Sequence, residues 1–152
     1  MALESVLLAY DCKPPAVAAL DTVADIVEQT GAKLTIVCVL SVRTSGEGAI
    51  PPGASLTEAI AATRSRLARV QEELARKGVT RVETLFLEGD PVERVLEAAQ
   101  ERSANLIVVG SRGLSTTGRF FLGSVSDGIL HHAKCPVLVV KSGGNSPAPA
   151  RP

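Results

Sequence analysis

Residues 105–126 of this chain read N-L-I-V-V-G-S-R-G-L-S-T-T-G-R-F-F-L-G-S-V-S. The apolar run at 106–109 is long enough for one buried strand and too short for a helix. Gly110 ends this run, Gly113 follows in a polar segment, and the apolar spacing beyond Gly123 is that of a helix. The stretch therefore predicts a strand, a glycine-rich loop and a helix. In that arrangement, backbone N–H groups of the loop and of the helix start can hold a phosphate.

The rest of the sequence alternates between short apolar runs and segments with helical spacing. This alternation predicts a doubly wound α/β fold, in which parallel strands are joined by right-handed helical crossovers and helices cover both faces of the sheet. Such sheets bind ligands beyond the carboxyl ends of their strands, where we expect Asp11 and Gly110. The alternation alone does not say whether those two residues are neighbours. The other predicted strands are residues 6–10, 34–40, 81–87 and 136–140, and the other predicted helices begin near Pro14, Ser55 and Asp90.

Local signals mark the helix ends. Ser55 and Glu58 have the spacing of a capping box, Asp90 is a predicted N-cap followed by a proline, and Gly31 is a predicted C-terminal cap. Two ion pairs at i,i+4 spacing, Glu72–Arg76 and Glu73–Lys77, indicate a solvated face on the second helix. The apolar residues on one face of that helix are Leu56, Ile60, Leu67, Val70 and Leu74.

The composition predicts a soluble cytoplasmic protein. Lys and Arg total 16, as do Asp and Glu, so the chain has no basic excess for binding nucleic acid, and aromatic residues make up only 3%. The three cysteines are far apart in sequence, which argues against a disulfide framework or a zinc site. We find no signal-peptide pattern and no membrane-spanning run. We expect one domain over residues 1–141 and a disordered tail over residues 142–152.

The glycine loop does not match two common phosphate-binding motifs. A G-x-G-x-x-G dinucleotide fingerprint is absent, and the loop follows the fourth predicted strand rather than the first. Gly113 and Gly118 have the spacing of a P-loop, but Arg119 and Phe120 stand where the lysine and the Mg²⁺-binding hydroxyl would be. We therefore reject both motifs.

What remains is the spacing G-x2-G-x9-G-S, formed by Gly110, Gly113, Gly123 and Ser124. Glycines let a backbone turn sharply and approach a ligand without a Cβ in the way. Ser124 and Ser126 could bind a phosphate, or Ser124 could simply cap the helix. Spacing alone leaves phosphate binding and a purely structural strand-to-helix loop equally open.

The long glycine motif, followed by a helix and C-P-V-L-V-V, resembles that of the universal stress protein family. The resemblance extends to V-L-L-A-Y-D at the start, L-T-I-V-C-V in the second strand and E-G-D-P before the third helix. It covers nearly the whole chain ahead of the tail. It implies an open, Rossmann-like sheet of five parallel strands in the order 3-2-1-4-5, which would place Asp11 beside the glycine loop.

In this family the motif G-x2-G-x9-G-[S/T] marks members that bind ATP. By resemblance, Asp11 and Val39 would lie against the nucleoside, and the phosphates would meet the loop and the start of the following helix. The cofactor implied is ATP, with the need for Mg²⁺ left open. The binding residues implied are Asp11, Val39, Val109, Gly110, Gly113, Gly123, Ser124 and Val125.

We interpret the protein as a nucleotide-dependent regulatory module of the stress response rather than an enzyme, because no catalytic or metal-binding arrangement can be argued. Bound ATP would order the loops at 44–54 and 114–119 and so change the surface offered to a protein partner that the sequence does not name. The resemblance also implies a homodimer through Val137–Val140, which would cover an apolar sheet edge. The alternatives are slow ATP hydrolysis or phosphotransfer using Asp11 with Mg²⁺, and a dimeric scaffold that binds no nucleotide. We expect Cys38 to be a core residue. Cys12, near the predicted pocket, could be a reactive thiol, but we expect it to be inert.

Overall fold

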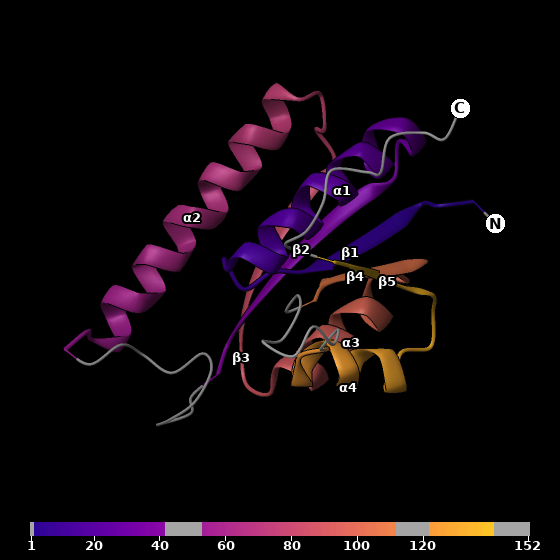
Figure 1. Cartoon of the computed structure of the whole chain (residues 1–152). Helices are drawn as coiled ribbons and strands as arrows, with labels where there is room; N and C mark the ends of the chain where they lie inside the picture. The colour runs from indigo at the N-terminus through magenta and orange to yellow at the C-terminus, as the bar shows by residue number, and fades with distance from the viewer. Residues whose placement is uncertain (1, 42–52, 112–121, 142–152) are drawn as a thin grey trace, which may run out of the picture.

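The computed structural model describes residues 2–41, 53–111 and 122–141 (Figure 1). Strands and helices alternate along the chain, as the sequence predicts. Among the described residues, no helix is both long and apolar enough to cross a membrane. The elements are β1 (Ser5–Ala9), α1 (Pro14–Thr30), β2 (Lys33–Leu40), α2 (Leu56–Arg76), β3 (Val82–Glu88), α3 (Pro91–Glu101), β4 (Leu106–Gly110), α4 (Ser124–His132) and β5 (Val137–Val140).

The five strands form one parallel sheet in the order β3-β2-β1-β4-β5. Leu8 of β1 lies opposite Ile36 of β2 on one side and Val108 of β4 on the other. The predicted doubly wound fold and its strand order are therefore confirmed. Because the chain order reverses between β1 and β4, the carboxyl ends of these two neighbouring strands form the switch point at which such sheets bind ligands.

Helices cover both faces of the sheet, with α1 and α2 on one side and α3 and α4 on the other (Figure 1). Alternate residues of each central strand enter different cores. Leu8, Ile36 and Val108 pack under α1 and α2, whereas Leu7, Val37 and Ile107 pack under α3 and α4. This double coverage is why the central strands read as continuous apolar runs rather than as alternating ones.

The predicted helix caps are present. The Ser55 hydroxyl accepts a hydrogen bond from Glu58 N, and the Glu58 carboxylate accepts one from Ser55 N, which completes the capping box of α2. The Asp90 side chain accepts from Glu93 N at the start of α3. Gly31 follows α1 with a φ of 71°, a left-handed conformation that glycine adopts without steric cost.

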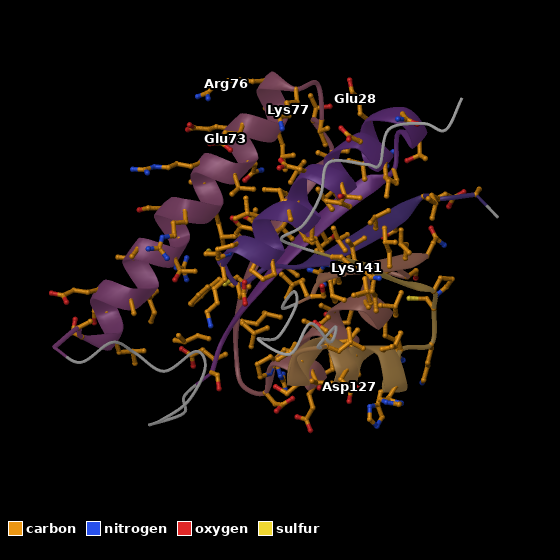
Figure 2. The ribbon with its side chains drawn as sticks, viewed as in Figure 1. Glu28, Glu73, Arg76, Lys77, Asp127 and Lys141 are labelled. Atoms are coloured by element: carbon orange, nitrogen blue, oxygen red, sulfur yellow. The ribbon has the colours of Figure 1, made fainter. Side chains whose placement is uncertain are left out.

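Only the second half of α2 packs against the core. Leu67, Val70 and Leu74 are buried, whereas Leu56 is 44% exposed, and Figure 1 shows the first turns of this helix extending beyond the sheet. The predicted Glu72–Arg76 ion pair is present at 3.8 Å. Lys77, which with Arg76 and Glu73 is labelled in Figure 2, pairs with Asp21 of α1 at 3.7 Å instead of with the predicted Glu73. This ion pair therefore links α2 to α1.

Candidate functional site

The candidate site lies at the carboxyl edge of the sheet, where β1 and β4 end side by side. Asp11 follows β1 and Gly110 is the last residue of β4. The helices that follow these strands, α1 and α4, lie on opposite faces of the sheet. The fold thus brings together two of the sequence-predicted site residues that lie about a hundred positions apart.

Gly110 lacks a side chain because the start of α1 occupies the space. A Cβ built at Gly110 would lie 2.3 Å from the carbonyl oxygen of Pro15 and 2.9 Å from Ala16 N. Both distances are far below van der Waals contact, and both atoms belong to a backbone that cannot swing aside. The sequence predicts that this glycine lets the backbone approach a ligand, and that stays a prediction. The structure adds a reason of its own, which is the close packing of α1 against β4.

The start of α4 carries three of the predicted residues. Gly123 is the N-cap, with a φ of −66° and a ψ of 160°, and no side chain caps this end of the helix. Ser124 is exposed and is the first helical residue, so the alternative in which it serves as the cap is wrong. Ser126 is buried and its hydroxyl donates to the Gly110 carbonyl oxygen at 2.8 Å, which ties α4 to the end of β4. Ser126 therefore has a structural role, and Ser124 is the hydroxyl left facing outward.

Capping divides the four described helices into two pairs. Side chains cap α2 and α3, as described above, but neither α1 nor α4 has a side-chain cap hydrogen bond. In α1, Pro14 and Pro15 remove the first N–H groups. In α4, the first turn keeps its N–H groups, together with the partial positive charge of a helix N-terminus. This end of α4 therefore has the chemistry to bind an anion, and it directly follows the glycine motif.

The three predicted valines lie on one side of the sheet. Val39, Val109 and Val125 belong to the apolar cluster under α3 and α4. Val39 and Val125 are half-buried, but Val109 is only 2% exposed, so its side chain does not reach the surface. A ligand at this edge would meet Val109 only through its main chain, whereas Val39 has apolar surface to offer.

Asp11 is exposed, and its carboxylate accepts a hydrogen bond from Lys13 N at 3.0 Å. This contact closes a short turn and uses one of the two carboxylate oxygens. Gly113 lies outside the described residues, as do most of the loop at 44–54 and all of the loop at 114–119. Of the eight predicted residues, seven are described and all seven are at or next to the carboxyl edge.

A neighbourhood that the sequence did not reveal lies at the same edge. Cys38 is buried in the apolar cluster under α1 and α2, and Cys12 packs against the same cluster, although 26 positions separate the two residues. The pairing of β1 with β2 accounts for it, because Tyr10 N donates to Val37 O and brings the end of β1 level with Cys38. Strand order, once known, would have been the signal for this neighbourhood.

Two other features of the described residues do not suggest a ligand site. No three His, Cys, Asp or Glu side chains within residues 2–41, 53–111 and 122–141 gather as a possible metal site. A hollow between α1 and α2, bordered by Asp21, Glu73 and Lys77, has a volume of about 20 Å³. That is room for about one water molecule, and none of the predicted site residues lines it.

The sheet order and the switch point between β1 and β4 define a doubly wound α/β protein of the Rossmann-like class. Comparison with known proteins narrows this class. The family model described as the universal stress protein family matches residues 3–141. The chain belongs to the universal stress protein family.

Individual relatives agree with this assignment. A relative from Staphylococcus haemolyticus, whose name places it among the universal stress proteins, is 34% identical over 140 residues, which cover 91% of this chain and 85% of the relative. The solved structure of the universal stress protein UspA from Lactobacillus plantarum is 25% identical, with a TM-score of 0.74 over 92% of this chain and 99% of that one. A universal stress protein solved in complex with cAMP is 26% identical, with a TM-score of 0.69 and coverage of 92% and 98%.

Proposed function

We propose that this chain binds ATP at the carboxyl edge of its sheet and acts in the cytoplasm as a nucleotide-dependent regulatory module of the stress response. The observation that carries the proposal is the start of α4. This helix begins at Gly123 without a side-chain cap, presents the Ser124 hydroxyl outward, and follows the switch point of the sheet. A helix N-terminus of this kind favours phosphate groups through both its N–H donors and its dipole.

The described residues also fit the rest of a nucleotide. Val39 is half-buried, so it offers an apolar surface for a base without leaving a cavity when no ligand is bound. The second carboxylate oxygen of the exposed Asp11 can accept a hydrogen bond from a ribose hydroxyl. The relative solved with cAMP supports an adenine nucleotide as the ligand class, because cAMP shares adenine, ribose and a phosphate with ATP.

In this proposal the residues bind and orient the nucleotide without cleaving it. The first turn of α4 holds the phosphates, Val39 supports the base and Asp11 fixes the ribose. The negative charge of the ATP phosphates would attract the N–H groups of the glycine motif and of the start of α4. No general base is assigned, because the described edge brings no catalytic pair of residues together. The readout would be a change in the surface offered to a protein partner.

A homodimer through β5 belongs to the same proposal. β5 is an outer strand of the sheet, and all four of its residues are half-buried. An apolar edge strand is a template for pairing with another strand, so pairing with a second copy would cover it. A monomeric mass in sedimentation at micromolar concentration would contradict the dimer without affecting nucleotide binding.

Calorimetric titration with ATP, AMP and cAMP tests the nucleotide proposal. We expect ATP to bind, and the Gly123→Val variant to lose binding while remaining folded, because the φ and ψ of Gly123 are open to any residue. The matched control is Asp90→Ala, which removes the cap of the neighbouring helix α3. It should cost about 1 kcal/mol of stability and leave binding unchanged. If none of the nucleotides gives heat or a thermal shift at millimolar concentration, the proposal is wrong. Unfolding of Gly123→Val would instead support a structural role for the motif.

A further inference from the structure

The hydroxyl of Ser126 joins the first turn of α4 to the end of β4. It donates to the carbonyl oxygen of Gly110 at 2.8 Å, and the serine is only 8% exposed. Hydroxyl side chains inside helices commonly donate to a carbonyl one turn earlier, as those of Thr22, Thr30 and Thr63 do in this chain. Ser126 instead donates to another element, 16 positions away. Its hydrogen bond therefore serves the placement of α4 rather than the helix itself.

Close packing fixes the middle of the same helix. Ile129 is fully buried in the apolar cluster under α3 and α4. A Cβ built at Gly128 would lie 2.8 Å from a methyl group of Val92, so the backbone of α4 lies directly against the start of α3. Because α4 has only 9 residues, a second attachment near its start determines the direction in which its N-terminus points. Ser126 provides that attachment.

The turn that Ser126 attaches is the one with unpaired N–H groups. Asp127 N donates to Gly123 O at 2.9 Å, which begins the hydrogen-bond ladder of the helix. The N–H groups of residues 124–126 precede that ladder, and no side chain caps them. The Asp127 carboxylate is exposed and lies 3.3 Å from Nε2 of His131, one turn further along the helix. The first turn of α4 therefore keeps its main-chain donors available for an anion.

Gly110 is a fixed acceptor for this hydrogen bond, because it is in contact with both faces of the sheet. On the α1 face, the carbonyl oxygen of Pro15 lies where a Cβ of Gly110 would be. On the opposite face, its own carbonyl oxygen accepts from Ser126, and Figure 1 shows α1 and α4 on those two faces. The packing against α1 leaves the end of β4 no room to move in that direction. The position of α4 is thus referred, through one hydrogen bond, to the switch point of the sheet.

We propose that Ser126 is a positioning residue of the proposed nucleotide site, on which this inference rests. Its hydrogen bond to Gly110 holds the first turn of α4 at the end of β4, so that the N–H groups of residues 124–126 meet the phosphates of the nucleotide. Ser126 does not bind the phosphates with its own hydroxyl, which is buried and already donates to Gly110. It therefore serves phosphate binding and not the contacts that Val39 and Asp11 make with the base and the ribose.

The test compares phosphate binding with nucleoside binding in the full-length protein. Calorimetric titration with ATP, and displacement of ATP by inorganic triphosphate or by adenosine, give the three affinities. In Ser126→Ala we expect ATP and triphosphate to bind about tenfold more weakly, the change that one hydrogen bond can cause, and adenosine to be unaffected. Ser126→Thr keeps the hydroxyl and should recover most of the loss. The matched control is Thr30→Ala, which removes a hydroxyl that donates over the same 2.8 Å but within α1, and all three affinities should stay unchanged.

A second measurement needs no ligand. In Ser126→Ala the amide hydrogen of Asp127 should exchange with solvent about tenfold faster than in the wild type, because the first turn of α4 is no longer held to β4. Ser126→Cys keeps a side chain of similar size with a weaker donor, so it should show a smaller loss of ATP affinity and serves if the alanine variant fails to fold.

The outcomes separate this inference from the proposed function. If the wild type binds ATP and Ser126→Ala binds it equally well, the positioning role is wrong and the nucleotide site stands. An equal loss of affinity for adenosine and for triphosphate would also overturn the role, because it would mean a general loss of structure. If the wild type binds neither ATP nor triphosphate, the proposed function is wrong, and the positioning role is wrong with it.

Discussion

The two ends of the sheet are built differently. At the amino edge, long-range hydrogen bonds and ion pairs join segments that are distant in the sequence. The Asn105 side chain accepts from Glu4 N at 2.8 Å and from Ser5 N at 2.9 Å. The Glu83 carboxylate accepts from two nitrogens of Arg102, at 3.1 and 3.2 Å, and lies 3.1 Å from Lys33 Nζ. These contacts tie the starts of β1, β2, β3 and β4 together.

At the carboxyl edge, the backbones of β4 and α1 pack closely, and the first turn of α4 has no side-chain cap on its N–H groups. Cys12 has a left-handed backbone, Gly110 has no room for a Cβ, and α4 begins without a side-chain cap. Gly110, Gly123 and Cys12 are all at this end. The difference teaches that this fold places long-range polar links at one end of the strands and uncapped N–H donors at the other. That separation agrees with where doubly wound sheets bind ligands.

The largest effect that we expect at the carboxyl edge comes from adding one methyl group to Gly110. In Gly110→Ala the new Cβ would lie 2.3 Å from Pro15 O, so α1 or β4 must shift. We expect a loss of about 3 kcal/mol in the free energy of unfolding, measured by urea denaturation. Such a loss would show that the carboxyl edge also contributes to stability, through close packing rather than through polar links.

Gly31→Ala is the matched control for this substitution. Gly31 has a φ of 71° but no atom within 4 Å of its added Cβ, so the variant tests backbone strain without a clash. It should cost about 1 kcal/mol. Equal losses in the two glycine variants would mean that the contact with Pro15 relaxes easily and that Gly110 is explained by something else.

A smaller loss is expected at the amino edge from Asn105→Ala. The substitution leaves two backbone N–H groups without their acceptor, for which we expect a loss of about 1–2 kcal/mol in the free energy of unfolding. Asn105→Asp keeps an acceptor oxygen and should recover most of the loss. Affinity for ATP, measured by calorimetry, should be unchanged in both variants. A change in affinity would show that the two edges are coupled.

The fold could be predicted from the sequence because its signals are local. Apolar runs predict the strands, and caps such as Ser55 with Glu58 or Asp90 with Glu93 act across three residues. The strand order was not fixed by the pattern and came only from the family resemblance. Once that order is known, Asp11 and Gly110 necessarily share an edge.

The features that the sequence did not predict join residues far apart in the chain. The space that Gly110 leaves open is filled by Pro15, Ser126 donates to Gly110, and Cys12 packs against the apolar cluster that holds Cys38. Each contact depends on which residues the strand order and register bring side by side. The spacing of apolar residues along the sequence does not contain that information. For the same reason the sequence left Ser124 and Ser126 equivalent, whereas only Ser126 points inward to a carbonyl.

The smallest expected effect is the pH dependence that Glu83 gives to the amino edge. Its hydrogen bonds from Arg102, and then those from Lys33, hold the pKa of the Glu83 carboxyl below its ordinary value. A carboxyl group whose pKa is lower in the folded state stabilises the fold fully above its unfolded pKa of about 4.3. That contribution is lost as the pH falls through the folded pKa. Because the side chain is 33% exposed, solvent screening limits the contribution to about 0.5 kcal/mol.

Glu83→Gln should therefore be about 0.5 kcal/mol less stable than the wild type near neutral pH, and the difference should shrink toward zero near pH 3, as measured by urea denaturation. The control is Glu72→Gln, because Glu72 is 69% exposed and its ion pair with Arg76 is longer, at 3.8 Å. That variant should match the wild type at both pH values. ATP affinity should not change in either variant, since both residues are remote from Asp11 and from α4. A Glu83→Gln deficit that persisted in acid would mean that the carboxylate acts through packing rather than charge.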